Sequence, residues 1–235
     1  MIRSLLYISL APVLVIALYI YLRDKYEKEP VISLLKALFT GIIISIPVVL
    51  IEEKSSLLST LFPGLLNPLY TGFIVASLTE EGFKFLAFML IFWRSRDFNE
   101  RFDGIVYAVF ISLGFAAVEN VIYVYKGGYE IGLVRAVTAV PAHALFATVM
   151  GYHLANARFY PDRRTRELIL AFLVPFIWHG LYDFLLMTKK EAFLFLFIPL
   201  FIYYWVIGLK RMKELSATSI FRNDLPTPED TDNNN

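Results

Sequence analysis

The stretch Ser77-Leu78-Thr79-Glu80-Glu81-Gly82-Phe83-Lys84-Phe85 places two carboxylates and a lysine near the middle of an apolar run. The run extends from Tyr70 to Trp93, long enough to cross a bilayer, which needs about 20 residues. A charge at the centre of a transmembrane helix costs about 2.5–3.5 kcal/mol on insertion scales. Because packing does not explain three such charges, we expect this stretch to belong to a functional site.

The composition is that of a membrane protein. The chain has 235 residues, of which 57% are hydrophobic and 18% charged, whereas soluble domains have about 25% charged residues. It contains no cysteine, which excludes disulfides, thiolate metal sites, cysteine nucleophiles and palmitoylation. No basic run or nucleic-acid motif is present, so we expect no nucleic-acid partner.

The apolar runs predict an all-α, polytopic membrane helix bundle of about seven transmembrane helices. They cover residues 4–22, 32–51, 70–93, 104–126, 134–157, 168–187 and 191–209. The first run lacks an Ala-x-Ala-like cleavage site, so we keep it as a helix of the mature protein. We expect a transmembrane domain at 1–213, with its catalytic core at 70–187, and a disordered cytoplasmic tail at 214–235.

Lysine and arginine fall unevenly between alternate loops. The segments 23–28, 94–101, 158–166 and 210–213 are each richer in these residues than the neighbouring loops. Because cytoplasmic loops carry the excess of positive residues, we predict an outside N-terminus and a cytoplasmic C-terminus.

The ionisable residues inside the apolar runs agree in depth. In four of the predicted helices, acid or imidazole groups lie about 10–17 Å below the outer surface. His153 lies near the cytoplasmic end and does not join this layer. The polar residues of these four helices are Glu80, Glu81, Lys84, Glu119, Asn120, His143, His179 and Asp183.

Spacing within the predicted helices suggests partners. Lys84 follows Glu80 by four residues and Glu81 by three, so it can balance either carboxylate. Asp183 follows His179 by four, and it can fix the imidazole tautomer or act on a ligand beside it.

Proline and glycine are expected to shape the same region. Pro141 and Pro175 precede the two histidines of the layer, and proline inside a helix produces a kink. Four glycines are expected to permit close helix approach: Gly82, Gly114, Gly151 and Gly180.

Four motifs in this order resemble the PrsW family of intramembrane proteases, in the superfamily of CAAX prenyl and abortive-infection-type membrane proteases. They are Glu80-Glu81-Gly82-Phe83-Lys84, Phe115-Ala116-Ala117-Val118-Glu119-Asn120, His143 and His179-Gly180-Leu181-Tyr182-Asp183. CAAX proteases have histidine where this chain has Glu119, which favours the PrsW branch. The resemblance implies a protease of the bacterial plasma membrane that makes the first, extracytoplasmic cut in a single-pass anti-sigma factor during envelope stress.

Peptide hydrolysis needs an activated water and a stabilised oxyanion. We expect Glu80 or Glu81 to take the proton from water, and His143 and His179 to stabilise the oxyanion or protonate the leaving amine. Glu119 completes the set of candidate catalytic residues. The expected supporting residues are Lys84, which balances the carboxylates, Asn120, which can donate an amide hydrogen to the oxyanion, and Asp183.

Other functions also fit these residues. We favour metal-free catalysis without a cofactor, but a zinc site built from His143, His179 and Glu80 is the open alternative. Ser77 is a weaker candidate nucleophile, since no Gly-x-Ser-x-Gly pattern occurs. A proton-coupled transporter with a Glu/His relay is an alternative of another class. The oligomeric state is not predicted.

Overall fold

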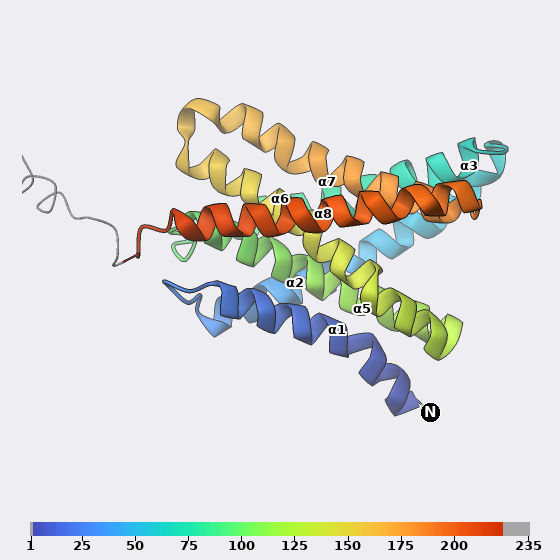
Figure 1. The fold of residues 1–235 in the computed structure, drawn as a ribbon, viewed down its shortest axis with the longest axis horizontal. Helices are drawn as coiled ribbons and strands as arrows, with labels where there is room; N and C mark the ends of the chain where they lie inside the picture. The colour runs from blue at the N-terminus through green and yellow to red at the C-terminus, as the bar shows by residue number, and fades with distance from the viewer. Residues whose placement is uncertain (1, 223–235) are drawn as a thin grey trace, which may run out of the picture.

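A computed structural model describes residues 2–222, and these residues form helices and connecting turns without a β-strand. The predicted all-α bundle is therefore confirmed (Figure 1). The elements in chain order are α1 (Ile2–Arg23), α2 (Val31–Ser56), the 3₁₀-helix η1 (Leu57–Leu61), α3 (Leu66–Leu69), the π-helix η2 (Tyr70–Ser77), α4 (Leu78–Ile91), α5 (Arg101–Val137), α6 (Ala139–Phe159), the 3₁₀-helix η3 (Pro161–Arg163), α7 (Arg164–Met187) and α8 (Glu191–Ala217).

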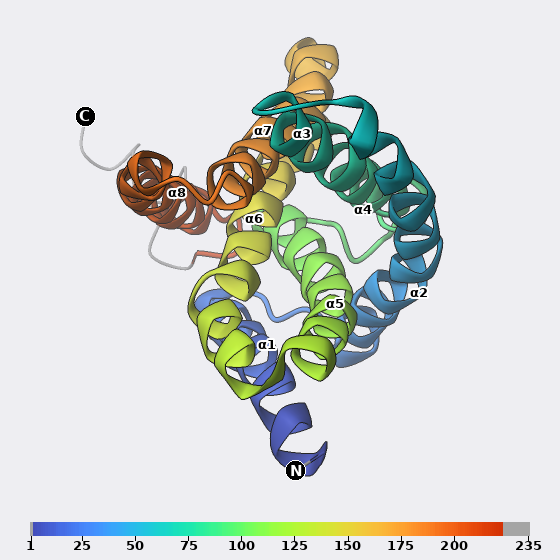
Figure 2. The same ribbon diagram turned by 90° about the vertical axis from the view of Figure 1, so that its right-hand side faces the viewer.

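Helices α5 and α6 form the centre of the bundle. α5 packs against α1, α2 and α6, and α6 packs in turn against α7 and α8 (Figure 2). The two central helices approach closely where Gly104 faces Gly151, since a Cβ on Gly104 would lie 2.6 Å from the Gly151 carbonyl oxygen. Because glycine has no side chain, the backbones of α5 and α6 come into contact here. This contact fixes the position of one helix along the other.

Three of the four glycines predicted to permit close approach do so. Gly114 lies against the Leu38 backbone, Gly151 against Gly104, and Gly180 against the Phe73 ring. Gly82 differs, because a Cβ added there would meet its nearest neighbour, Phe172, at 3.9 Å.

In the described part of the chain, five stretches are long and apolar enough to cross a membrane. One of them, Arg101–Phe159, contains both α5 and α6. The 70–93 run is not among the five, since it is divided between η2 and α4 and carries three charges. The chain is thus a multi-pass membrane protein, while the count of seven helices and the orientation stay predictions.

The boundary between α5 and α6 differs from the expected one. α5 extends to Val137 and contains a kink at Gly128, whose φ of 78° and ψ of −168° suit glycine alone. α6 then begins at Ala139, so Pro141 lies in its first turn, where proline is tolerated, and the expected kink inside a helix is wrong there. Pro175 does lie inside α7.

Helix α8 continues four residues into the segment predicted to be a tail. It ends at Ala217, and Leu215 is fully buried. Ser219, just beyond the helix, is also buried and donates a hydrogen bond to Glu100. The rest of the predicted disordered tail, residues 223–235, lies outside the described residues.

Candidate active site

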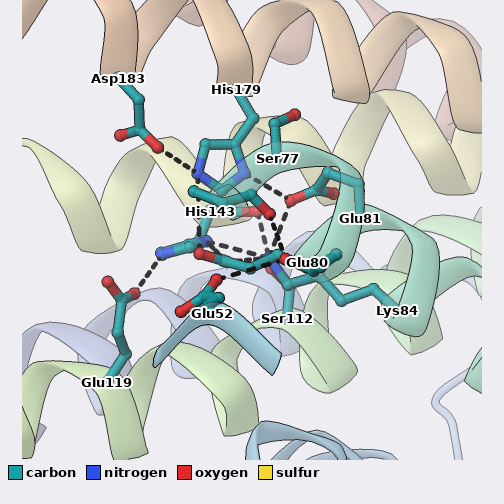
Figure 3. Close-up of polar contacts among 12 residues, drawn as sticks. Glu52, Ser77, Glu80, Glu81, Lys84, Ser112, Glu119, His143, His179 and Asp183 are labelled. Atoms are coloured by element: carbon teal, nitrogen blue, oxygen red, sulfur yellow. Dashed lines mark hydrogen bonds and ion pairs between the residues drawn. The ribbon is translucent and has the colours of Figure 1, made fainter. Parts of the chain in front are cut away.

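Glu80, Glu81 and Lys84 lie on one buried face of α4, which follows directly from the π-helix η2. The Lys84 Nζ atom is 3.0 Å from Glu80 Oε2 and 2.8 Å from Glu81 Oε1 (Figure 3). All three side chains are at most 5% exposed. Lys84 therefore contacts both carboxylates at once, which the spacing alone left open.

His143, on α6, joins this group through both ring nitrogens. Its Nδ1 lies 3.2 Å from Lys84 Nζ, and its Nε2 lies 2.7 Å from Glu119 Oε2. Because an ammonium group only donates, Nδ1 accepts from Lys84, and Nε2–H donates to Glu119. The contact with Lys84 thus fixes the tautomer of His143.

His179, on α7, completes the convergence. Its Nδ1 lies 2.9 Å from Glu81 Oε1, and its Nε2 lies 3.3 Å from Asp183 Oδ2. The His179 ring stacks on Phe146 at a centroid distance of 5.0 Å, which fixes its plane. The predicted pairing of Asp183 with His179 is present (Figure 3).

Residues from α4, α5, α6 and α7 thus meet in one buried group, as their shared depth predicted. We call this group the histidine cluster. Its members are Glu80, Glu81, Lys84, Glu119, His143, His179 and Asp183.

Asn120 has a different position from the one expected. Its Nδ2 donates to the Ser9 carbonyl of α1 at 2.8 Å, and its Oδ1 accepts from Arg135 Nε at 2.9 Å. Arg135 in turn lies 3.2 Å from Glu119 Oε1. Asn120 therefore positions the arginine that balances Glu119, and its amide is bonded to α1 instead of being directed at the histidines.

Two further side chains lie apart from the chemistry. The Ser77 hydroxyl is buried and donates to the Phe176 carbonyl at 2.6 Å, a contact that ties η2 to α7. His153 Nδ1 pairs with Glu167 at 2.6 Å, away from the cluster, as its depth indicated. Among the described residues, no side-chain hydrogen bond or ion pair joins Ser77 or His153 to a member of the histidine cluster.

Sequence reasoning missed Glu52. Its position beside Glu53 and Lys54 suggested an outer loop, but α2 extends through these residues to Ser56. Thr79, next to Glu80, lies 3.4 Å from Glu52 Oε1, and Figure 3 shows the Glu52 side chain beside Glu80. The sequence did hold a signal for Glu52. It is an acidic residue at the polar end of an apolar run, and such a residue belongs to the site when a neighbouring helix carries buried charges.

The cluster contains two groups whose ligand atoms are close enough to share a metal ion. Glu80, Glu81 and His179 form one, and Glu80, Glu119 and His143 form the other, with one atom from each residue within 4.8 Å of the others. Glu81 Oε2 is buried and has no hydrogen-bond partner in the described chain. Imidazole and carboxylate donors are those of catalytic zinc sites, so the residues fit such an ion.

Known proteins resemble this chain over most of its length. The family profile described as PrsW family intramembrane metalloprotease matches residues 29–208. Protease PrsW of Oceanobacillus iheyensis is 35% identical over 92% of this chain and 98% of its own. The proteins of that name from Clostridioides difficile and Bacillus subtilis are each 33% identical, over 90% and 91% of this chain and 91% and 96% of their own. No solved structure gives a significant match.

These comparisons decide between the predicted classes of function. They support a protease of the bacterial cell membrane over a transporter. The family description makes a metal possible, so the expectation of metal-free catalysis is not confirmed. With the profile covering most of the chain and relatives at 30–35% identity, this chain belongs to the PrsW family of intramembrane metalloproteases and is a multi-pass membrane endopeptidase.

Proposed function

We propose that this endopeptidase hydrolyses its substrate with a water activated by Glu80. The observation that carries the proposal is the position of Glu80 between both histidines. Its Oε1 lies 3.9 Å from His179 Nε2, and its Oε2 lies 3.8 Å from His143 Nδ1. Oε1 accepts no hydrogen bond from any described residue, so this oxygen is available to a water.

Glu81 has a different role in this proposal. Its Oε1 already accepts from Lys84 and lies against His179 Nδ1. Taking a proton there would weaken both contacts, of which the one with His179 holds α4 to α7. We therefore assign Glu81 to orienting Lys84 and His179, and Glu80 to removing the proton from water as the hydroxide attacks the scissile carbonyl.

His179 is the assigned donor to the developing oxyanion. Its contact with Asp183 is the longer of its two close contacts, and the Asp183 side chain is 16% exposed. A substrate carbonyl can therefore replace Asp183 at Nε2, while Glu81 keeps the ring in place. The proton held by Glu80 then passes to the leaving amine.

A zinc ion would supply further activation of the water if it is bound here. Either Glu80, Glu81 and His179 or Glu80, Glu119 and His143 would hold it. The expected set of His143, His179 and Glu80 is not one of the groups with ligand atoms this close together. Lys84 limits this arrangement, since its ammonium group contacts Glu80 and His143, so a bound cation requires Lys84 to shift toward Glu81. The catalytic assignments of Glu80 and His179 are tested separately from the metal.

The proposed substrate is a single-pass anti-sigma factor, cut at its extracytoplasmic side. Two arguments support it. The motif resemblance implies this substrate class, and the distribution of Lys and Arg in the loops predicts that the histidine cluster lies in the outer half of the bilayer. The lipid bilayer itself is the other partner.

The experiment is co-expression of the chain with a tagged single-pass anti-sigma factor, followed by detection of the cleaved fragment. Glu80→Gln should reduce the fragment by about 10²- to 10⁴-fold, because the amide cannot accept the proton from water. Glu53→Gln is the matched control, since Glu53 is exposed on α2, and it should leave cleavage unchanged.

Two results would contradict the proposal. Cleavage by Glu80→Gln at the wild-type rate would remove the base assignment. An intact anti-sigma factor, together with cleavage of another single-pass reporter, would remove the substrate assignment but keep the chemistry. For the metal, protein stripped by a chelator should regain activity with added zinc, and full activity without metal would exclude a catalytic zinc site in the histidine cluster.

A further inference from the structure

A second group of buried acids lies at the start of α5, about 24 Å along that helix from Glu119. It combines the α1–α2 connection with the first turn of α5, and its four deepest members are at most 3% exposed. We call it the acidic cluster. Its members are Asp24, Glu27, Glu29, Glu100 and Asp103.

The acidic cluster has no ion pair with Lys or Arg among the described residues. Lys25 and Lys28 lie between the acids in sequence, yet neither forms an ion pair with a described acid of the cluster, and Lys28 Nζ donates to the main-chain carbonyls of Tyr21 and Asp24. Removing a carboxylate from water without a partner is costly, so buried charges in proteins are paired or bind metals.

Three oxygen atoms of the cluster are buried without a hydrogen-bond donor: Asp24 Oδ1, Glu27 Oε2 and Asp103 Oδ1. The other oxygen of each residue is used. Asp103 Oδ2 accepts from the backbone amides of Asn99 and Glu100 at 2.8 and 2.7 Å, and Glu27 Oε1 accepts from Asn99 Nδ2 at 3.0 Å. These bonds fix the carboxylates in place and leave the unpaired oxygens for another partner.

One ligand atom from each of Glu27, Glu29 and Asp103 lies within 4.8 Å of the other two. Two oxygens on opposite sides of a calcium ion, each at about 2.4 Å, are about 4.8 Å apart, and around magnesium the separation is about 4.2 Å. The Tyr107 hydroxyl, bonded to Glu29, adds another oxygen beside the group. With oxygen donors alone, the site suits a hard cation and not zinc.

We propose that Glu27, Glu29 and Asp103 bind a hard divalent cation, Ca²⁺ or Mg²⁺, that joins the α1–α2 connection to the start of α5. A proton shared between Glu29 and Asp103 is the competing explanation. One shared proton satisfies a single pair of oxygens, so it leaves Glu27 Oε2 unpartnered. A cation serves more oxygens at once and offsets their charge.

The test uses the purified full-length protein in detergent, freed of metal with a chelator and titrated with CaCl₂ or MgCl₂. Calorimetry should show one cation bound per chain, and the two salts distinguish the ions. At about 100 times Kd, the bound ion should raise Tm by about 5 °C or more. Glu27→Gln and Asp103→Asn should each weaken binding at least tenfold.

Controls separate this site from the histidine cluster and from misfolding. His179→Ala should keep the binding and the rise in Tm, since it alters only the other cluster. Glu53→Gln, an exposed change of the same kind as Glu27→Gln, should also keep both. Glu27 is only half-buried, so its variant remains informative if Asp103→Asn does not fold.

Three outcomes would overturn the proposal. The first is that neither salt binds, which would favour the shared proton. The second is that Glu27→Gln, or a folded Asp103→Asn, binds as tightly as the wild type. The third is that His179→Ala abolishes binding, which would place the ion in the histidine cluster.

Discussion

The histidine cluster and the acidic cluster both bury several carboxylates, but they differ in what balances the charge. In the histidine cluster, Lys84 contacts Glu80 and Glu81, and Arg135 contacts Glu119. In the acidic cluster, no lysine or arginine of the described chain forms an ion pair with any of the five acids. One cluster therefore has internal compensation, and the other relies on protons or on an external cation.

This difference explains what each cluster can do. The cations of the histidine cluster are fixed to the protein, so its carboxylates and imidazoles keep one arrangement, which suits a catalytic site. The charge of the acidic cluster is balanced by protons or cations taken up from solution, so the stability of the protein depends on the ions present. Substitutions can test this contrast, and the largest effect is expected where a cation that balances two buried carboxylates is removed.

Lys84→Met should have the largest effect. The methionine keeps the bulk of the side chain but leaves Glu80 and Glu81 buried without their shared cation. Breaking a buried ion pair in this way costs about 3–5 kcal/mol, so we expect a large fall in Tm and loss of cleavage. Thermal unfolding in detergent measures the first and the reporter assay the second. A Lys84→Met protein as stable as the wild type would show that Glu80 and Glu81 do not depend on Lys84 for compensation of their charge.

Glu80→Gln and Glu81→Gln should separate catalysis from structure within the histidine cluster. Glu80→Gln should reduce cleavage about 10²- to 10⁴-fold, the range for loss of a general base, with a smaller fall in Tm than that of Glu81→Gln, because Lys84 keeps its contact with Glu81. Glu81→Gln should lower both activity and Tm, since Glu81 contacts Lys84 and His179. If Glu81→Gln folds like the wild type and Glu80→Gln does not, the two roles are exchanged.

The residues of the histidine cluster could be predicted because charge inside an apolar run has few explanations. Each of Glu80, Glu119, His143 and His179 lies inside a long apolar run, so their depths could be compared. Their contacts could not be predicted, since spacing does not tell that Lys84 reaches His143 on another helix. Glu52 was missed because an acid beside Glu53 and Lys54 resembles a solvated loop.

The sequence predicts the class of the fold but not its details, just as it predicts the residues of the histidine cluster but not their contacts. Apolar runs indicate helices, yet they do not show the π-helix of Tyr70–Ser77 or the kink at Gly128. The acidic cluster escaped notice because Asp24, Glu27 and Glu29 lie in a polar connection. Its burial comes from packing against the start of α5, which a single sequence does not show.

A matched pair of Glu→Gln substitutions sharpens the comparison further. Glu119→Gln removes the charge that faces both Arg135 and His143, at 3.2 and 2.7 Å. We expect it to destabilise the protein by about 1–3 kcal/mol, the cost of leaving buried polar groups unsatisfied. Thermal unfolding measures this change. An unaltered Tm would mean that Arg135 finds another acceptor and that Glu119 is not part of the compensation.

Glu27→Gln in chelator should have the smallest effect of all. Glu27 Oε2 has no donor to lose, and the amide oxygen of glutamine can still accept from Asn99. We therefore expect Tm to stay the same or to rise by the equivalent of up to about 1 kcal/mol, because an unpaired charge has been removed. The same substitution should lower Tm relative to the wild type once Ca²⁺ or Mg²⁺ is added. A fall in chelator as large as that of Glu119→Gln would show that Glu27 already has a partner within the protein, and the contrast between the two clusters would then be lost.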